Sequence, residues 1–130
     1  MTNLSKYSNM VYRIIGAAMI VHSEMGYGLL EPVYYKNHLL DKKYKMDIVV
    51  DDIIVELKSV SCLVVGHRAQ LCNYLRLTRK PLGLLINFGE ESLIGERWAY
   101  DKNTNECFLV DRNMERVKED YSYLLDDDED

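Results

Sequence analysis

Apolar positions along the chain follow a helical period in three separate segments. In residues 9–25 they recur at steps of three and four, which predicts an amphipathic helix. A second helix is expected over residues 30–43, where Pro32 fits the first turn because its missing N–H costs nothing there. The same spacing predicts a third helix over residues 66–78, which Pro81 brings to an end.

Other segments have the pattern of β-strands. Residues 45–50 and 53–60 flank Asp51 and Asp52, and this arrangement predicts a hairpin with a two-residue turn. Residues 82–88 are almost continuously apolar, which is typical of a strand buried on both faces.

The last part of the chain predicts a second hairpin and a final helix. Residues 97–100 and 106–110 form the expected strands of the hairpin, and residues 113–125 form the expected helix. The order of all elements predicts an α/β or α+β fold, in which helices cover a mixed sheet.

Composition indicates a globular protein of one domain. The chain has 130 residues, of which 48% are hydrophobic and 28% charged, so bulk disorder is excluded. We expect one domain over residues 1–125, with its core in 9–90 and the hairpin and helix appended in 94–125. The apolar stretch 14–21 is too short to span a bilayer, and the first residues do not resemble a secretory signal. The expected location is therefore cytoplasmic, without a membrane partner.

Charge and cysteines narrow the functional classes. The net charge of −5 equals the charge of residues 126–130, an acidic tail that is expected to be disordered. The rest of the chain is neutral, so it lacks the broad basic footprint of many nucleic-acid binders. Cys62, Cys72 and Cys107 show no CxxC spacing, which argues against a disulfide framework or a zinc site and favours small buried or half-buried thiols.

The first hairpin carries the candidate chemistry. A two-residue turn pairs Val50 with Ile53, and therefore Asp47 with Glu56. Paired residues have Cβ atoms roughly 4.5–5.5 Å apart, so the two carboxylates repel unless a cation lies between them. A divalent metal ion is the natural occupant.

Lys58 lies on the same face of this hairpin as the two carboxylates. It can position a water molecule or neutralise charge that develops on a phosphate. Two carboxylates and a lysine are the minimum set for metal-assisted phosphodiester hydrolysis. The alternative is structural: Glu56 and Lys58 form a solvent-facing charge pair, which Asp47 simply flanks. The opposite face is wholly apolar and is expected to meet a core; its residues are Ile48, Val50, Ile53, Val55 and Leu57.

Further motifs indicate a family. Gln70 and Tyr74 are one helical turn apart and share a face. The order D…ExK…QxxxY resembles RecB-like members of the PD-(D/E)xK nuclease superfamily. Residues 28–34 read GLLEPVY, a G-x-x-E-x-x-Y motif, and residues 82–89 read LGLLINFG. Together these motifs resemble the GxxExxY protein family, a small bacterial group of that superfamily, over residues 9–90.

The resemblance implies a restriction-endonuclease-like core, a mixed sheet flanked by helices, and a role for each matching residue. The implied ligands of Mg²⁺ or Mn²⁺ are Asp47, Glu56, the Leu57 backbone carbonyl and Glu31. Lys58 matches the catalytic lysine. Gln70 and Tyr74 match the pair that orients this lysine or the nucleic-acid backbone. His67, three residues before Gln70, is a further candidate for support of the site.

One departure from the family is clear. Tyr34 and Asp47 are only 13 positions apart, where relatives carry another strand, so the core is expected to be shortened between the second helix and the metal-site strand. The shortened core is expected to be compensated in one of two ways. The C-terminal hairpin extends it, or a partner chain pairs with the exposed sheet edge and forms a homodimer.

Three functions follow from these observations. The first is a Mg²⁺-dependent nuclease that acts on DNA or RNA. The second is a catalytically degenerate nuclease fold that serves as a binding or assembly module. The third is a hydrolase for a small phosphorylated compound.

Overall fold

A computed structural model describes residues 4–25, 34–35, 38–39, 46–121 and 124. A 3₁₀ turn, η1 (Leu4–Tyr7), leads into helix α1 (Ser8–Met25), and helix α2 spans Val65–Thr78. The strands are β1 (Tyr34–Tyr35), β2 (His38–Leu39), β3 (Met46–Val50), β4 (Ile53–Lys58), β5 (Leu82–Asn87), β6 (Ile94–Asp101) and β7 (Glu106–Val110). None of the helices within these residues is long and apolar enough to cross a membrane.

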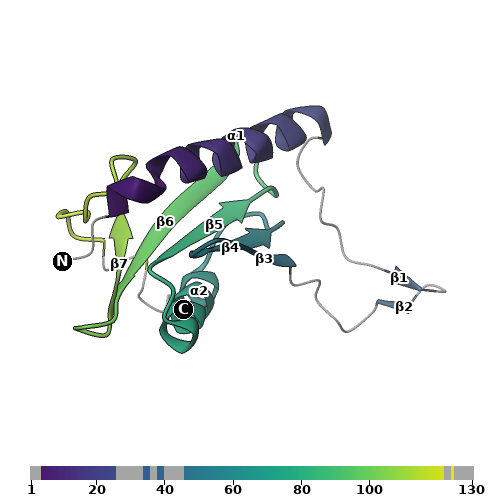
Figure 1. Ribbon diagram of the computed structural model, residues 1–130. Coiled ribbons are helices and arrows are strands. Elements are labelled where there is room, and N and C mark those ends of the chain that lie inside the picture. The colour runs from purple at the N-terminus through teal and green to yellow at the C-terminus, as the bar shows by residue number, and fades with distance from the viewer. Residues whose placement is uncertain (1–3, 26–33, 36–37, 40–45, 122–123, 125–130) are drawn as a thin grey trace.

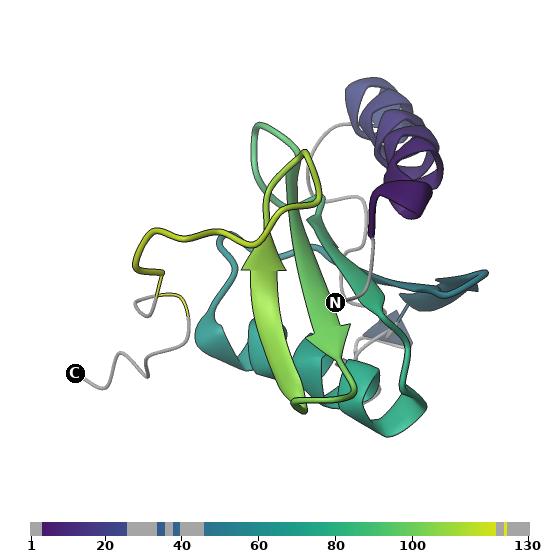
Figure 2. The same cartoon turned by 60° about the vertical axis from the view of Figure 1, so that its left-hand side comes forward.

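Strands β3 to β7 form one five-stranded sheet in sequence order. β4 and β5 are parallel and are connected through α2, whereas every other neighbouring pair is antiparallel. Helix α1 lies along one face of the sheet and α2 lies against the other, as Figures 1 and 2 show. The mixed sheet between helices confirms the expected α+β class.

The β3–β4 hairpin has the register that the sequence predicts. Asp51 and Asp52 form its turn, and Asp51 adopts a left-handed backbone with φ of 52°. Val50 pairs with Ile53, and Asp47 pairs with Glu56. The second predicted hairpin is also confirmed, because β6 and β7 are antiparallel neighbours.

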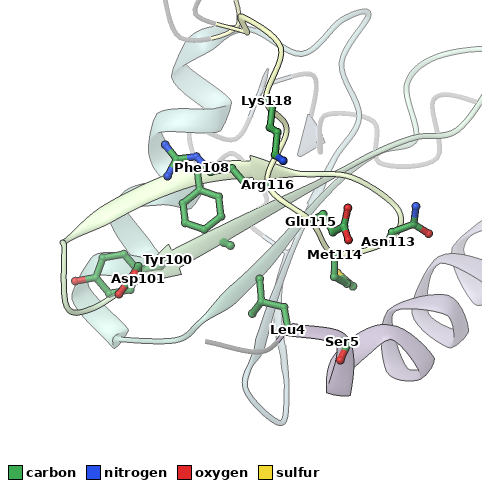
Figure 3. Close-up of a pocket in the computed structure, with 11 residues that line it drawn as sticks. Leu4, Ser5, Tyr100, Asp101, Phe108, Asn113, Met114, Glu115, Arg116 and Lys118 are labelled. Atoms are coloured by element: carbon green, nitrogen blue, oxygen red, sulfur yellow. The ribbon is translucent and has the colours of Figure 1, made fainter. Parts of the chain in front are cut away.

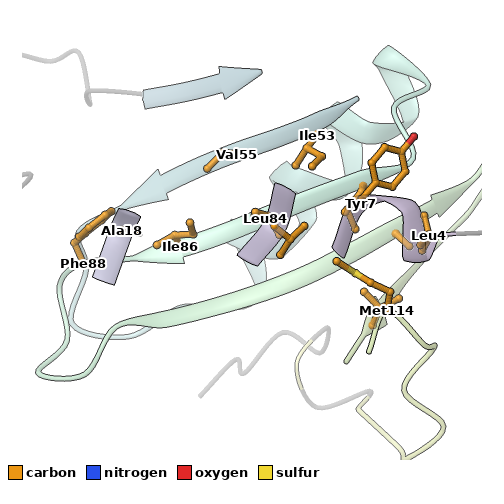
Figure 4. Close-up of a cluster of buried hydrophobic side chains, with 13 residues drawn as sticks. Leu4, Tyr7, Ala18, Ile53, Val55, Leu84, Ile86, Phe88 and Met114 are labelled. Carbon is orange, nitrogen blue, oxygen red and sulfur yellow. The ribbon is translucent and has the colours of Figure 1, made fainter. Parts of the chain in front are cut away.

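The sheet separates two apolar cores. The α1-side core (Figure 4) consists of Leu4, Tyr7, Val11, Ala18, Ile53, Val55, Leu82, Leu84, Ile86, Phe88, Ala99, Val110 and Met114. The α2-side core consists of Ile54, Leu71, Cys72, Leu75, Leu85, Trp98 and Tyr100. Because side chains alternate along a strand, β4 and β5 contribute to both cores, which explains why apolar residues occupy both faces of these strands.

Strand β3 forms one edge of the sheet within the described residues. Its Ile48 side chain is 43% exposed, so the prediction that this residue faces a core is wrong. Val50 on the same strand does pack against the α1-side core. An edge strand has a neighbouring strand on one side only, and this leaves its outer positions open to solvent.

The prediction of a second helix over residues 30–43 is wrong at the positions of this segment that the structure describes. β1 and β2 pair as antiparallel strands, with Tyr34 opposite Leu39. Adjacent tyrosines favour extended backbone, and here this local preference replaces the helical spacing. Residues 26–33, 36–37 and 40–45 lie outside the described residues, as does the acidic tail at 126–130.

The prediction of a final helix over residues 113–125 is wrong for residues 113–121, which form turns and irregular structure. The Asp111 carboxylate accepts the backbone N–H groups of Asn113 and Glu115. Met114 takes a left-handed conformation with φ of 63° and enters the α1-side core. The Asp111 hydrogen bonds hold the chain in a turn, and a turn of this kind competes with helix formation.

The cysteines follow the prediction in part. Cys72 is buried and Cys107 is half-buried, with their Sγ atoms 2.6 Å apart, whereas Cys62 is exposed. The Cys107 thiol donates its hydrogen to Cys72, and this bond together with burial raises the pKa of Cys107. This contact links α2 to β7 on the α2 side of the sheet.

Candidate active site

Strand β4 presents Glu56 and Lys58 on the α2 side of the sheet. Ile54, two residues before Glu56, belongs to the α2-side core, and alternate residues of a strand share a face. The Glu56 side chain is 1% exposed, so its carboxylate lies well away from bulk water. Lys58 is half-buried at the end of the strand. The two functional groups are therefore held by a strand that is paired on both sides, with β3 and with β5.

The amide of Gln70 lies beside the Lys58 ammonium. Lys58 Nζ donates a hydrogen bond of 2.9 Å to Gln70 Oε1. Gln70 stands in the second turn of α2, and Tyr74 follows one turn later, half-buried against the α2-side core. The packing of α2 on the sheet thus fixes the position of the lysine head group.

Asp47 is the direct register partner of Glu56 in the β3–β4 ladder. The structure describes its backbone, and its side chain lies outside the description, as does Glu31 entirely. Leu57 stands between Glu56 and Lys58 and packs against the α1-side core. Within the described part of the chain, no group of three or more His, Cys, Asp or Glu residues could hold a metal ion.

The donors that the resemblance implies suit a hard cation. All of them are oxygen atoms, from three carboxylates and one carbonyl, and such sets bind Mg²⁺ or Mn²⁺ in preference to soft metals. The buried Glu56 carboxylate beside its register partner Asp47 agrees with this chemistry. The residues present therefore fit a divalent metal ion.

His67 takes part in the start of α2. Its Nδ1 atom accepts the backbone N–H of Val64 at 3.0 Å, and its own backbone N–H donates to the Val64 carbonyl, so His67 satisfies the backbone at the first turn. This bond gives His67 a structural role at the helix terminus, one turn before Gln70.

Asn87 supports the site, and the sequence pattern did not single it out. It is fully buried at the end of β5, where it is the register partner of Lys58. Its Oδ1 atom accepts the N–H groups of Val60 and Gly89, and its Nδ2 atom donates to the Val60 carbonyl. Asn87 thereby fixes the chain that leaves Lys58. The sequence does carry one signal for this role, because Asn87 is the single polar residue within the apolar run 82–88.

An ion pair anchors α2 to the sheet on the same side. Arg68 forms two bonds to the Glu96 carboxylate of β6, at 2.7 and 2.8 Å. Trp98 Nε1 donates to the same carboxylate at 3.1 Å. Because Arg68 lies two residues before Gln70, this pair restrains the turn of α2 that faces Lys58.

A hollow of about 480 Å³ lies elsewhere, over β6 and β7 (Figure 3). Leu4, Phe108 and Met114 supply apolar walls, and Arg116 and Lys118 stand at its border. None of the described site residues lines it, so the candidate site is a surface at the end of β4 rather than this hollow.

Comparison with known proteins gives one match. A family model described as the PD-(D/E)XK nuclease superfamily matches residues 32–97, which is half of the chain. The matched range contains β3, β4, α2 and β5, and with them Glu56, Lys58 and Gln70. No curated protein and no solved structure matches the chain.

Proposed function

The chain belongs to the PD-(D/E)XK nuclease superfamily, and from this membership we propose that it hydrolyses phosphodiester bonds of DNA or RNA with Mg²⁺ or Mn²⁺. The observation that carries the proposal is the hydrogen bond between Lys58 of the E-x-K segment and Gln70 of the next helix. A structural charge pair on a half-exposed strand does not explain why Glu56 is 1% exposed. Membership of the GxxExxY group, the bacterial origin that it implies and a cytoplasmic location are part of the proposal.

Each residue has a role in this proposal. Asp47, Glu56 and the Leu57 carbonyl would hold the metal ion, with Glu31 as a further ligand. The bound metal would lower the pKa of a water molecule and polarise the scissile phosphate. Lys58 carries a positive charge toward the phosphate, where negative charge develops. Gln70 keeps the Lys58 head group in place, since its amide oxygen accepts the ammonium hydrogen.

Residues on α2 would contact the substrate. Tyr74 lies one turn beyond Gln70, and we assign its phenol to the nucleic-acid backbone. His67 supports the site indirectly, because its ring is part of the cap that starts α2. Arg76 and Arg79 near the end of this helix are exposed and add positive charge along the same side of the sheet.

A cleavage assay tests the proposal. Labelled single- and double-stranded DNA and RNA are incubated with the full chain in Mg²⁺ or Mn²⁺. Lys58→Ala is expected to lower the cleavage rate by about 10²–10³-fold, the usual cost of removing one group that stabilises transition-state charge. Lys102→Ala is the matched control, since Lys102 is exposed in the β6–β7 turn. Equal metal-dependent cleavage by wild type and Lys58→Ala would contradict the proposed role.

The second candidate is a nuclease fold that serves as an assembly module. The exposed edge strand β3 favours it, because its Val49 side chain is 60% exposed and a second copy could pair there antiparallel as a homodimer. Light scattering across a range of concentrations tests this pairing, with Val49→Lys as the variant that should prevent it. A monomer at all concentrations would rule out the homodimer.

A further inference from the structure

We propose that the protein binds a phosphomonoester in a second site, on the α1 side of the sheet. A cavity of about 520 Å³ lies between the beginning of α1, strand β6 and the turn after β7. Its polar lining consists of Ser8, Asn9, Arg97 and Arg112, and its apolar lining includes Val11 and Tyr12. The sheet separates this cavity from Glu56 and Lys58, so the inference does not depend on the proposed nuclease function.

Two arginines give the cavity its charge. Arg97 stands in β6 next to Trp98, which belongs to the α2-side core, so alternation places Arg97 on the α1 side. Arg112 follows β7 and is exposed. Burial lowers the pKa of Arg97, and the positive charge of Arg112, which lines the same cavity, lowers it further. An anion between the two guanidinium groups would relieve this repulsion.

Arg97 has an unused hydrogen-bond donor. Its Nε atom is buried, and it has no hydrogen-bond partner among the residues that the structure describes. A buried donor of this kind costs free energy unless a ligand or water satisfies it. Nε itself is closed to the cavity, but the Arg97 side chain lines it, and a phosphate there would be bound through the outer N–H groups of the guanidinium.

Asp111 is an acidic side chain whose negative charge acts on Arg97 and partly offsets the lowered pKa of this arginine. Its Oδ1 atom accepts the N–H groups of Asn113 and Glu115, which holds its carboxylate in the turn after β7. Asp111 is also not part of the cavity lining. The cavity therefore keeps a net positive charge, to which the Ser8 hydroxyl and the Asn9 amide add neutral donors.

The remaining walls indicate what the phosphate is attached to. Tyr12 is 78% exposed at the cavity, and aromatic side chains at such positions stack on planar rings. Val11 and Met114 are buried in the α1-side core and provide an apolar base. A phosphate at the arginines and a ring on Tyr12 correspond to a nucleoside monophosphate.

Titration calorimetry with adenosine monophosphate tests the site. The full chain carrying Glu56→Gln is used, so that the proposed nuclease site does not contribute. We expect binding at least tenfold tighter than that of adenosine, and a tenfold or greater loss in Arg97→Gln. Arg112→Gln should show the same loss, and because this residue is exposed in a turn, its variant keeps the test valid if Arg97→Gln does not fold. Arg13→Gln is the matched control, since Arg13 is exposed on α1 and does not line the cavity.

The outcomes are distinct. Loss in both arginine variants and not in the control supports the site, whatever the result of the cleavage assay. Competition by a 5′-phosphorylated oligonucleotide would then assign the phosphate to a nucleic-acid end, and lack of competition would assign it to a free nucleotide. Equal affinity for adenosine and its monophosphate, or unchanged binding in Arg112→Gln, would overturn the proposal.

Discussion

Gly89 lies where two backbone segments approach too closely for a side chain. A Cβ atom at this position would stand 2.3 Å from the Val60 carbonyl oxygen and 2.4 Å from the Val60 nitrogen. Both contacts are with backbone, which cannot rotate away. Gly89→Ala is therefore expected to lower the free energy of unfolding by about 2 kcal/mol or more, measured by urea denaturation.

Gly16 is the matched control for this substitution. It lies within α1, and a Cβ atom there would meet nothing within 4 Å. Gly16→Ala should raise the free energy of unfolding by up to about 1 kcal/mol, since alanine favours helix more than glycine does. An equal change of stability in the two variants would contradict the close backbone contact between Gly89 and Val60.

At the residue scale, the alternation of side chains along β4 is enough to predict that Glu56 and Lys58 lie on one face of the sheet. The spacing of Gln70 and Tyr74 places them on one helix face, and only the resemblance to the nuclease superfamily implied that Gln70 orients the lysine, to which its amide oxygen is hydrogen-bonded. Asn87 could not be assigned in this way. Its four hydrogen bonds depend on how the chain after Lys58 returns past the end of β5, and no local period encodes that path.

At the scale of elements, the attachment of α2 depends on a buried ion pair. The side chains of Arg68 and Glu96 are 10% and 15% exposed. Arg68→Met would leave the Glu96 carboxylate in this poorly hydrated place, so we expect the free energy of unfolding to fall by about 3 kcal/mol. Urea denaturation followed by circular dichroism measures the change.

Arg76→Met is the control for the same helix. Arg76 is exposed and donates a long hydrogen bond of 3.4 Å to Asn73, so its replacement should change stability by at most about 0.5 kcal/mol. A loss of stability in Arg68→Met no greater than in Arg76→Met would show that the buried pair does not anchor α2.

Elements were predicted correctly where hydrophobic period and burial agree. Helix α2 and strands β4 and β5 meet this condition, because their apolar positions match the two cores. The segment after β7 does not, since the Asp111 carboxylate bonds two backbone N–H groups and directs Met114 into the core. Side-chain to backbone bonds of this type are invisible to a periodicity argument.

At the scale of the whole molecule, the sheet separates the two proposed sites. Glu56, Lys58 and Gln70 lie on the α2 side, whereas Arg97 and Arg112 line a cavity on the α1 side. Ligands of the two sites should therefore bind independently. Each should also stabilise the folded chain, because a ligand that binds only the native state raises the free energy of unfolding.

The stabilisation of the folded chain by a bound metal ion is the first of these two effects to measure. With Mn²⁺ at about ten times its dissociation constant, the native chain gains about 1.4 kcal/mol, and its melting temperature should rise by a few degrees. Glu56→Gln keeps the shape of the side chain and removes the ionised carboxylate, so its melting temperature should not respond to Mn²⁺. Lys102→Ala, which alters an exposed turn, should respond as wild type does. An equal rise in Glu56→Gln would place the metal elsewhere, and it would remove the carboxylate of β4 from the proposed catalytic site even if the chain cleaves nucleic acid.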